Sequence, residues 1–431
     1  MGRGAELAAL EPHLPAHPLS AGDGPSSAAR AGAASGLYAH VPFCARRCGY
    51  CDFSSGSLSR DAVERYLAGI EREAELRAPE AAGVTFRSVF FGGGTPSALS
   101  ARHFGRLWKA LVSRFAIAPD AEITLEANPE TVKPALLDAW REAGVNRLSM
   151  GAQSFDPVEL DALGRIHGPE RPGEAFALAR RHGFTRLSLD LMFGFPGNGR
   201  ETWRATLESA LALEPEHLSA YCFIPEIGTP LGAAALRGER ALPEAEVQAD
   251  LYETLVARLT AAGYGLYETS NFARPGGECR HNLVYWLRRD YLGLGPSAHS
   301  LWRGARYGNA YALETWAGAL EGNRPWFEVE PESPASRADE VVMLGLRFGG
   351  GLLAADYPPG SWRETWLRYA GAFERALATG RLERVSGGYR IAPRHRFVAD
   401  EITAWLMSEA ERGRPRHRHD AAHLTVRAAR P

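Results

Sequence analysis

Residues 37–53 read LYAHVPFCARRCGYCDF, an apolar run followed at once by Cys44, Cys48 and Cys51. The run 37–43 predicts a β-strand, and the three cysteines fall on the short loop after it. Three cysteines crowded into eight residues suit a secreted disulfide framework poorly. Thiolate sulfur is a preferred ligand of iron–sulfur centres, so each cysteine can hold one iron of a cubane cluster and leave the fourth iron open.

Two other interpretations of the cysteines stay open. A zinc ion prefers four ligands, often in paired Cys-x-x-Cys spacing, and the nearest candidate for a fourth is His40 on the strand itself. Alternatively, the three cysteines are unrelated buried side chains. The remaining cysteines, Cys222 and Cys279, can equally be small buried hydrophobes, and we assign neither to the cluster.

Beyond this stretch, apolar runs alternate with amphipathic segments, which indicates βα units that build a parallel sheet. No GxGxxG pattern opens the first helix, so the six units predict an α/β fold of the incomplete (β/α)6 barrel type rather than an open Rossmann sheet. The expected strands are 37–43, 88–91, 122–127, 147–153, 186–193 and 217–224. The clearest helical patterns are 61–77, 101–115, 134–143 and 200–213.

The rhythm of the sequence divides the chain into five parts. We expect a disordered tail at 1–35, the barrel at 36–275, a linker at 276–334, a small α-rich C-terminal domain at 335–410, and a disordered tail at 411–431. The last domain includes a short hairpin near 386–389.

Composition sets further bounds. The formal net charge of -2 gives no electrostatic reason to expect nucleic acid. No apolar run is long enough to span a membrane, and the start lacks the pattern of a secretory signal. The sequence therefore predicts a cytoplasmic protein that is not an integral membrane protein.

Further polar and glycine-rich motifs follow the predicted strands. A run of three glycines ending in Gly93 and Gly94, followed by Thr95, lies at the end of the second strand, where glycine lets the backbone approach a ligand closely. The loops at the carboxyl ends of barrel strands gather the functional groups of such folds, so we expect all these residues at one mouth. The other polar residues in this series are Glu126, Gln153, Arg165 and Asp190.

The Cys-x-x-x-Cys-x-x-Cys spacing, with Tyr50 before the third cysteine, resembles the signature of the radical S-adenosylmethionine (SAM) superfamily. The resemblance implies a 4Fe-4S cluster whose open iron chelates the methionine end of SAM. From Tyr38 to about Met407 the chain is similar to the oxygen-independent coproporphyrinogen III oxidase family and its HemW-type relatives. The matching residues that contact the cofactor there are Tyr38, Tyr50, Gly93, Gly94, Thr95, Glu126, Gln153, Arg165, Asp190 and Ile224.

One departure from the oxidase pattern and one further motif point to the HemW-type haem chaperones. The oxidase pattern continues with a fourth cysteine where this chain has Phe53. His281, Asn282, Tyr285 and Trp286 match a His-Asn-x-x-Tyr-Trp motif that is associated with haem in HemW-type proteins. The resemblance implies that His281 ligates haem iron, although a histidine beside aromatic residues is often only a packing residue.

Three functions follow from these features. The first is a haem chaperone that binds haem, a 4Fe-4S cluster and SAM and passes haem to acceptor proteins, which the resemblance extends to membrane-bound respiratory proteins. The second is an oxygen-independent coproporphyrinogen dehydrogenase, which uses radical chemistry to decarboxylate porphyrinogen propionates and needs an electron donor for its cluster. The third is a purely structural role, in which a cluster or zinc ion only stabilises the loop. Sequence favours the first.

Overall fold

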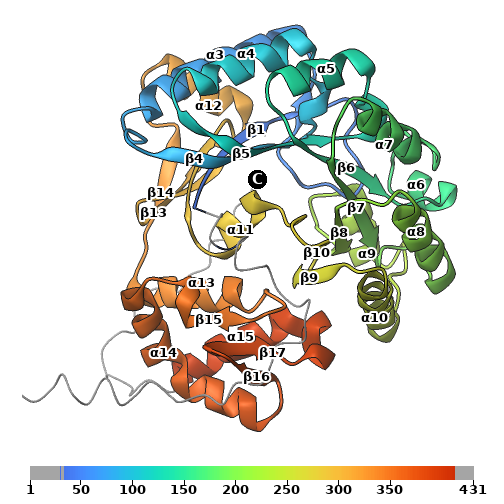
Figure 1. Ribbon diagram of the computed structural model, residues 1–431, viewed down its shortest axis with the longest axis vertical. Coiled ribbons are helices and arrows are strands. Elements are labelled where there is room, and N and C mark those ends of the chain that lie inside the picture. Colours follow the sequence, from blue (N-terminus) through green and yellow to red (C-terminus); the bar gives the residue numbers. More distant parts are fainter. Residues whose placement is uncertain (1–29, 31–33, 413–431) are drawn as a thin grey trace, which may run out of the picture.

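The computed structural model describes residue 30 and residues 34–412, and its centre is a curved, largely parallel sheet (Figure 1). Six parallel strands lie side by side in chain order, which confirms the predicted α/β class and its six βα units. They are β1 (Ser35–Val41), β4 (Thr85–Gly93), β5 (Ala116–Ala127), β6 (Arg147–Gln153), β7 (Arg186–Phe193) and β8 (His217–Cys222).

Helices cover the outer face of this sheet. The first begins where the Ser59 side chain accepts a hydrogen bond from the amide of Ala62, and it buries Val63, Leu67 and Ile70 against the strands. The covering helices are α3 (Arg60–Arg77), α4 (Ala101–Val112), α5 (Pro134–Glu142), α6 (Pro157–Ala162), α7 (Arg171–Arg181), α8 (Arg200–Ala212) and α10 (Ala245–Ala261). The short helix α9 (Pro230–Leu236) instead lies beside the loop that follows β1, where the amide of Leu231 donates to the carbonyl of Gly49.

The barrel is incomplete because antiparallel strands occupy both ends of the sheet. Beyond β8 come β10 (Asn271–Ala273) and β9 (Gly265–Glu268). Beyond β1 lies β11 (Asp290–Leu294), which pairs with β1 in parallel, with Leu37 opposite Leu292. The sheet then continues through β12 (His299–Trp302), β13 (Ala305–Asn309) and β14 (Phe327–Glu330).

The segment 276–334, which we interpreted as a linker, is therefore part of the main sheet. Short antiparallel strands joined by tight turns lack the βα rhythm, which is why the sequence pattern changes there. In this segment α11 (Arg280–Trp286) packs on β1, β4 and β11 from the concave side of the sheet, and α12 (Leu313–Glu321) packs on α3 (Figure 1).

The C-terminal domain has its own apolar core, which includes Tyr369, Phe373 and Tyr389. It contains α13 (Pro334–Gly345), α14 (Pro359–Ala378) and α15 (Ala399–Arg412) beside a small sheet of β15 (Leu352–Leu353), β17 (Gly388–Ile391) and β16 (Leu382–Val385). The predicted hairpin is present, with a third strand that the sequence analysis did not anticipate.

Most of the two predicted tails, residues 1–29, 31–33 and 413–431, lies outside the described residues. Residue 35, the last of the predicted N-terminal tail, already belongs to β1. Within the part of the chain that the structure describes, each helix is too short or too polar to cross a bilayer.

Candidate functional site

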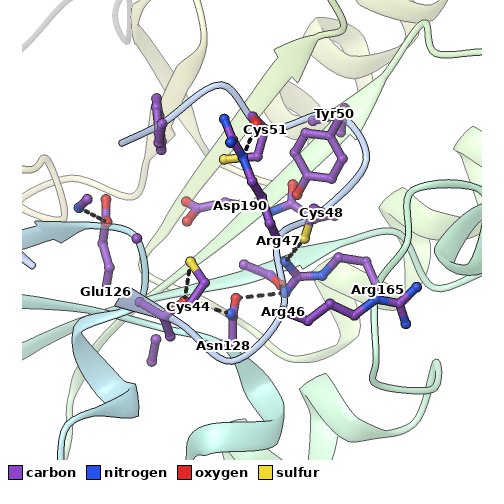
Figure 2. Close-up of a pocket in the computed structure, with 18 of the residues that line it drawn as sticks. Cys44, Arg46, Arg47, Cys48, Tyr50, Cys51, Glu126, Asn128, Arg165 and Asp190 are labelled. Carbon is purple, nitrogen blue, oxygen red and sulfur yellow. Dashed lines mark hydrogen bonds between the residues drawn. The ribbon is translucent and has the colours of Figure 1, made fainter. Parts of the chain in front are cut away.

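The three cysteines lie on the loop between β1 and α3, and this loop is closed at its base. A short parallel pair, β2 (Phe43–Cys44) and β3 (Gly56–Ser57), joins its two ends, and the amide of Gly56 donates to the carbonyl of Pro42 at 2.8 Å. Figure 2 shows Cys44, Cys48 and Cys51 on this one loop, and all three are partly exposed free thiols. The strand pairing thus fixes both ends of the loop that holds the three sulfur atoms.

Two of the sulfur atoms accept hydrogen bonds from other segments. The Thr95 hydroxyl donates to Cys44 Sγ at 3.3 Å, and Arg165 Nη1 donates to Cys48 Sγ at 3.4 Å. Hydrogen bonds to cysteine sulfur orient metal ligands and tune the potential of iron–sulfur clusters. The surroundings of the thiols therefore fit a cluster held by three cysteines.

The glycine-rich loop approaches the cysteine loop so closely that it needs glycine. The amide of Gly94 donates to Val41 O at 2.9 Å and that of Thr95 to Phe43 O at 2.7 Å. A Cβ on Gly94 would lie 2.6 Å from Phe43 O, and Gly93 has a φ of 110°. These contacts place Thr95 against Cys44.

Arg165 connects three neighbouring segments of the site. Besides Cys48, its guanidinium donates to Asn128 Oδ1 at 2.8 Å and to the carbonyl of Gly151 at 2.6 Å (Figure 2). Asn128 in turn donates to the Thr95 hydroxyl at 3.2 Å. The hydrogen-bonded chain from Cys48 to Cys44 therefore runs across the ends of β5 and β6.

Two carboxyl groups face the same space from β5 and β7. Burial and the nearby Asp190 raise the pKa of Glu126 to about 8. The hydrogen bond that Glu126 accepts from the amide of Gly93, at 3.2 Å, opposes this shift only in part. Burial also raises the pKa of Asp190, which accepts a hydrogen bond from the Ser149 hydroxyl. Two buried carboxyl groups favour a cationic ligand, and SAM carries a sulfonium and an ammonium group.

Gln153 has a strained backbone at the end of β6. Its φ is 67°, and the amide of Ser154 bonds to the carbonyl of Ala152 at 2.9 Å across it, so it is the centre of a rare form of γ-turn. The register with β7 shifts at the same place. Non-glycine strain of this kind concentrates at functional sites, and here it sets Gln153 at the edge of the cavity.

Tyr50 forms the apolar side of the site. It packs on a buried cluster that includes Leu163, Met192 and Phe223, and burial raises its pKa. The amide of Leu231 donates to the carbonyl of Gly49 at 2.8 Å, which ties the loop to the start of α9.

These groups line one cavity of about 330 Å³ at the carboxyl ends of β4 to β8, which we call the cluster cavity. Besides Gln153, ten of the predicted site residues line it, namely Cys44, Cys48, Cys51, Tyr50, Gly93, Gly94, Thr95, Glu126, Arg165 and Asp190. The sequence placed Asp190 in this group although it lies within β7 rather than at its end.

Three predicted site residues do not line the cluster cavity. Tyr38 faces a neighbouring cavity and contacts His40 Nδ1 through its hydroxyl at 3.0 Å. Ile224 is 69% exposed on the loop after β8. His281 is 0% exposed, and the prediction that it ligates haem stays a prediction.

His281 has a hydrogen-bond partner on each ring nitrogen. Nδ1 pairs with the Ser88 hydroxyl at 2.9 Å and Nε2 with the Tyr285 hydroxyl at 2.7 Å. The ring stacks on Phe90, with centroids 5.1 Å apart, and burial lowers the pKa of His281 to about 3. The imidazole is therefore neutral and enclosed.

The geometry of His40 does not support its role as a fourth zinc ligand. This side chain is buried, and its Nε2 contacts the carbonyl of Ser54 at 3.1 Å while Nδ1 contacts Tyr38. Among the described residues, no three His, Cys, Asp or Glu side chains are placed to hold a single metal ion. In a cubane cluster, by contrast, each cysteine binds a different iron.

Sequence reasoning missed several residues that the structure brings to the cluster cavity. Asn128 lies two residues after Glu126 in the run Leu-Glu-Ala-Asn-Pro, residues 125–129, so its position at the end of a predicted strand could have indicated a site residue. Ser149 is one of several buried polar residues on the inner strands, and nothing local in the sequence sets it apart.

Comparison with known proteins agrees with this arrangement. The family model described as the radical SAM superfamily matches residues 38–210. The chain is 37% identical to the heme chaperone HemW of Mycobacterium tuberculosis, over 86% of this chain and 94% of that protein. It is 40% identical to the heme chaperone HemW of Escherichia coli, over 61% of this chain and 69% of that protein.

A solved structure shares the whole architecture. The coproporphyrinogen III oxidase HemN of Escherichia coli, a radical SAM enzyme, matches with a TM-score of 0.75 at 25% identity, over 93% of this chain and 98% of that one. The fold and the cysteine loop are thus those of a radical SAM protein, for which a 4Fe-4S cluster and SAM are implied. Within that superfamily, the chain belongs to the HemW family.

Proposed function

We propose that this protein is a haem chaperone that carries a 4Fe-4S cluster and SAM and passes haem to acceptor proteins. The observation that carries the proposal is the 37% identity to a protein named heme chaperone HemW, over 94% of that protein. Phe53, which is 59% exposed on the cysteine loop, supports it, because the oxidase pattern has a cysteine at this position.

In this proposal Cys44, Cys48 and Cys51 ligate three irons, and Thr95 and Arg165 hold two of the thiolates in place. A 4Fe-4S cluster held there would supply an electron to bound SAM when the protein is reduced. The cationic groups of bound SAM would favour the ionised forms of Glu126 and Asp190, whose pKa values burial raises. The other contacts to SAM come from the predicted residues at the cavity edge, Tyr50, Gly93, Gly94 and Gln153.

The partners form part of the same proposal. We infer that haem-accepting proteins, including membrane-bound respiratory proteins, receive the cargo and that an electron donor reduces the cluster. We place the protein in the cytoplasm, since its five cysteines are all free thiols.

The test is an anaerobic reconstitution with iron and sulfide, followed by haem titration and by transfer to an apo-haem protein. We expect stoichiometric haem binding, transfer to the acceptor, and no consumption of coproporphyrinogen in the presence of SAM and a reductant. The second candidate is the coproporphyrinogen dehydrogenase, which the likeness to HemN favours. Formation of protoporphyrinogen without haem binding would overturn the chaperone assignment in its favour.

A further inference from the structure

A second cavity, of about 490 Å³, adjoins the cluster cavity. We call it the aromatic cavity, because most of its wall is aromatic. The two cavities have Asp52, Phe53, Gly93 and Glu126 in common. The ring-bearing residues in its wall are Tyr38, His40, Phe53, Tyr285, Tyr291, His299 and Tyr311.

Segments far apart in the chain build this cavity. The parallel pairing of β1 with β11 brings Tyr38 beside the hairpin of β12 and β13, and α11 adds Tyr285 from the concave side. The cysteine loop closes the wall: Ser54 Oγ donates to Tyr311 O at 2.9 Å, and the Tyr311 hydroxyl donates to Asp52 O at 3.2 Å. Phe53 and Tyr311 are each 59% exposed at the mouth.

The His-Asn-x-x-Tyr-Trp motif enters this wall through its tyrosine. His281 Nε2 pairs with the Tyr285 hydroxyl at 2.7 Å, and the Tyr285 ring packs edge-on against Tyr291 with centroids 4.6 Å apart. Since both ring nitrogens of His281 are engaged, its role in the structure is to orient Tyr285. It is a positioning residue for the cavity wall.

The accessible imidazole of the cavity is that of His299. Its side chain is 58% exposed, and its Nδ1 lies 3.6 Å from Glu330 Oε1. Within residues 34–412, the structure shows no hydrogen bond to its Nε2. Histidines that ligate metals commonly have a carboxylate near the other ring nitrogen, and Glu330 lies near this nitrogen but beyond hydrogen-bond distance.

Neighbouring backbone leaves room for this ring. Gly308 is paired with His299 across the hairpin, and a Cβ on Gly308 would lie 2.9 Å from Cε1 of the imidazole. The other histidine of the cavity, His40, has contacts on both nitrogens, as described above. Among the described residues, His299 is thus the one histidine in this wall whose ring nitrogens accept or donate no hydrogen bond within the chain.

The charges of the wall orient an incoming ligand. Asp52 is acidic, so it disfavours the propionates of haem inside the cavity and favours an orientation with the propionates toward solvent. The apolar macrocycle then faces the tyrosine and phenylalanine rings, which offer large flat surfaces.

We propose that the aromatic cavity is the haem site and that His299, rather than His281, ligates the iron through Nε2. This inference rests on the proposed function and specifies where the cargo is bound. In this proposal each of three residues has its own task. His299 ligates the iron, Glu330 orients His299 electrostatically, and His281 orients the cavity wall.

The test is a haem titration of the full chain, followed by absorbance spectra of ferric and ferrous haem. His299→Ala should weaken haem binding roughly 100-fold and remove the spectrum of imidazole-ligated haem, and Glu330→Gln should weaken binding roughly tenfold. The matched control is His182→Ala, because His182 Nδ1 also contacts a carboxylate, that of Asp138 at 2.6 Å, on the outer surface of the molecule. This variant should bind haem as the unmodified chain does.

A second pair of variants separates ligation from positioning. His281→Asn and Tyr285→Phe should each lower the affinity by a similar factor and leave the imidazole-ligated spectrum in place. Loss of that spectrum in His281→Asn, with an unchanged spectrum in His299→Ala, would overturn the proposal and return ligation to His281. If the unmodified chain binds no haem, the proposed function itself fails, which is a separate outcome.

Discussion

The cluster cavity and the aromatic cavity lie side by side but arise from the sequence in different ways. The cluster cavity collects one loop and the ends of successive parallel strands, each of which follows its predecessor in the βα order. The aromatic cavity depends on β11 pairing with β1, across about 250 residues of chain. One is a repeated local feature, whereas the other is a long-range assembly.

The two cavities also differ in charge and in donors. Thiols, carboxyl groups and Arg165 give the cluster cavity the groups that hold a cluster and a cationic cofactor. Phenol rings and one accessible imidazole give the aromatic cavity the groups that suit a flat, apolar, iron-containing ligand. The comparison shows that a single loop, residues 44–54, contributes to the walls of both cavities, with Asp52 and Phe53 common to the two.

The largest expected effect is on the cluster. Cys44→Ala should abolish nearly all iron uptake on anaerobic reconstitution, because two thiolates do not retain a cubane cluster, while haem affinity should change by no more than about twofold. Iron analysis and haem titration measure the two quantities. The control is Cys222→Ala, which alters a free cysteine outside the loop. Normal iron content in Cys44→Ala would contradict the assignment.

Next in size is the effect of Arg165 on SAM affinity. Arg165→Gln removes the charged donor that links Cys48, Asn128 and Gly151, and hydrogen bonds of charged groups are worth about 1.5–3 kcal/mol. We therefore expect SAM to bind roughly 10- to 100-fold more weakly in calorimetric titrations of the reconstituted protein. Arg171→Gln on the outer helix α7 is the control. Equal affinities in the two variants would remove Arg165 from the site.

A third prediction concerns the glycine-rich loop. Gly94→Ala forces a Cβ to within 2.6 Å of Phe43 O, and we expect destabilisation of about 1–3 kcal/mol together with impaired cluster assembly. Gly105→Ala is the matched control, because this glycine is inside α4 and nothing lies near its Cβ. That substitution should be neutral or stabilise by a few tenths of a kcal/mol to about 1 kcal/mol. Chemical denaturation of the cluster-free chain compares them, and equal stability of both variants would count against the close approach.

A fourth prediction is a pH dependence, whose effect within any one pH unit is small. The pKa of Glu126 is raised to about 8 from an ordinary value of 4.5, so between these pH values the folded chain holds a proton that the unfolded chain has lost. This group therefore makes stability fall as pH rises through that window, with a slope of at most about 1.4 kcal/mol per pH unit.

Glu126→Gln should flatten this part of the stability profile of the cluster-free chain, as measured by denaturation midpoints from pH 5 to roughly pH 8. Glu201→Gln, on the exposed side of α8, should leave the slope unchanged. Parallel profiles for the unmodified chain and Glu126→Gln would mean that the carboxyl is not buried beside Asp190.

The sequence was most informative where structure repeats locally. The bounds of β6 and β7 were predicted to the residue, because each is a mainly apolar segment that alternates with helical patterns and is bounded by turn residues. The residues of the cluster cavity followed from the same order, since parallel strands present their ends at one edge.

The second region of the molecule was beyond reach of local patterns. Strand β11 has five residues and no following helix, so segment 276–334 resembled a linker. No local pattern in either strand indicates that β11 pairs with β1. The burial of His281 depends on this pairing, because α11 packs against β1, β4 and β11. The motif was recognisable, but the environment of its histidine was not.

The most direct test of the two adjoining sites uses zinc protoporphyrin, a fluorescent analogue of haem, on chains with and without a reconstituted cluster. Because the cavities share residues of their walls, we expect the cluster to quench strongly the fluorescence of the bound porphyrin, and Cys44→Ala to show no quenching after the same treatment. Equal fluorescence of porphyrin bound to the cluster-loaded and cluster-free chains would contradict the account, since the porphyrin would then lie far from the cysteine loop.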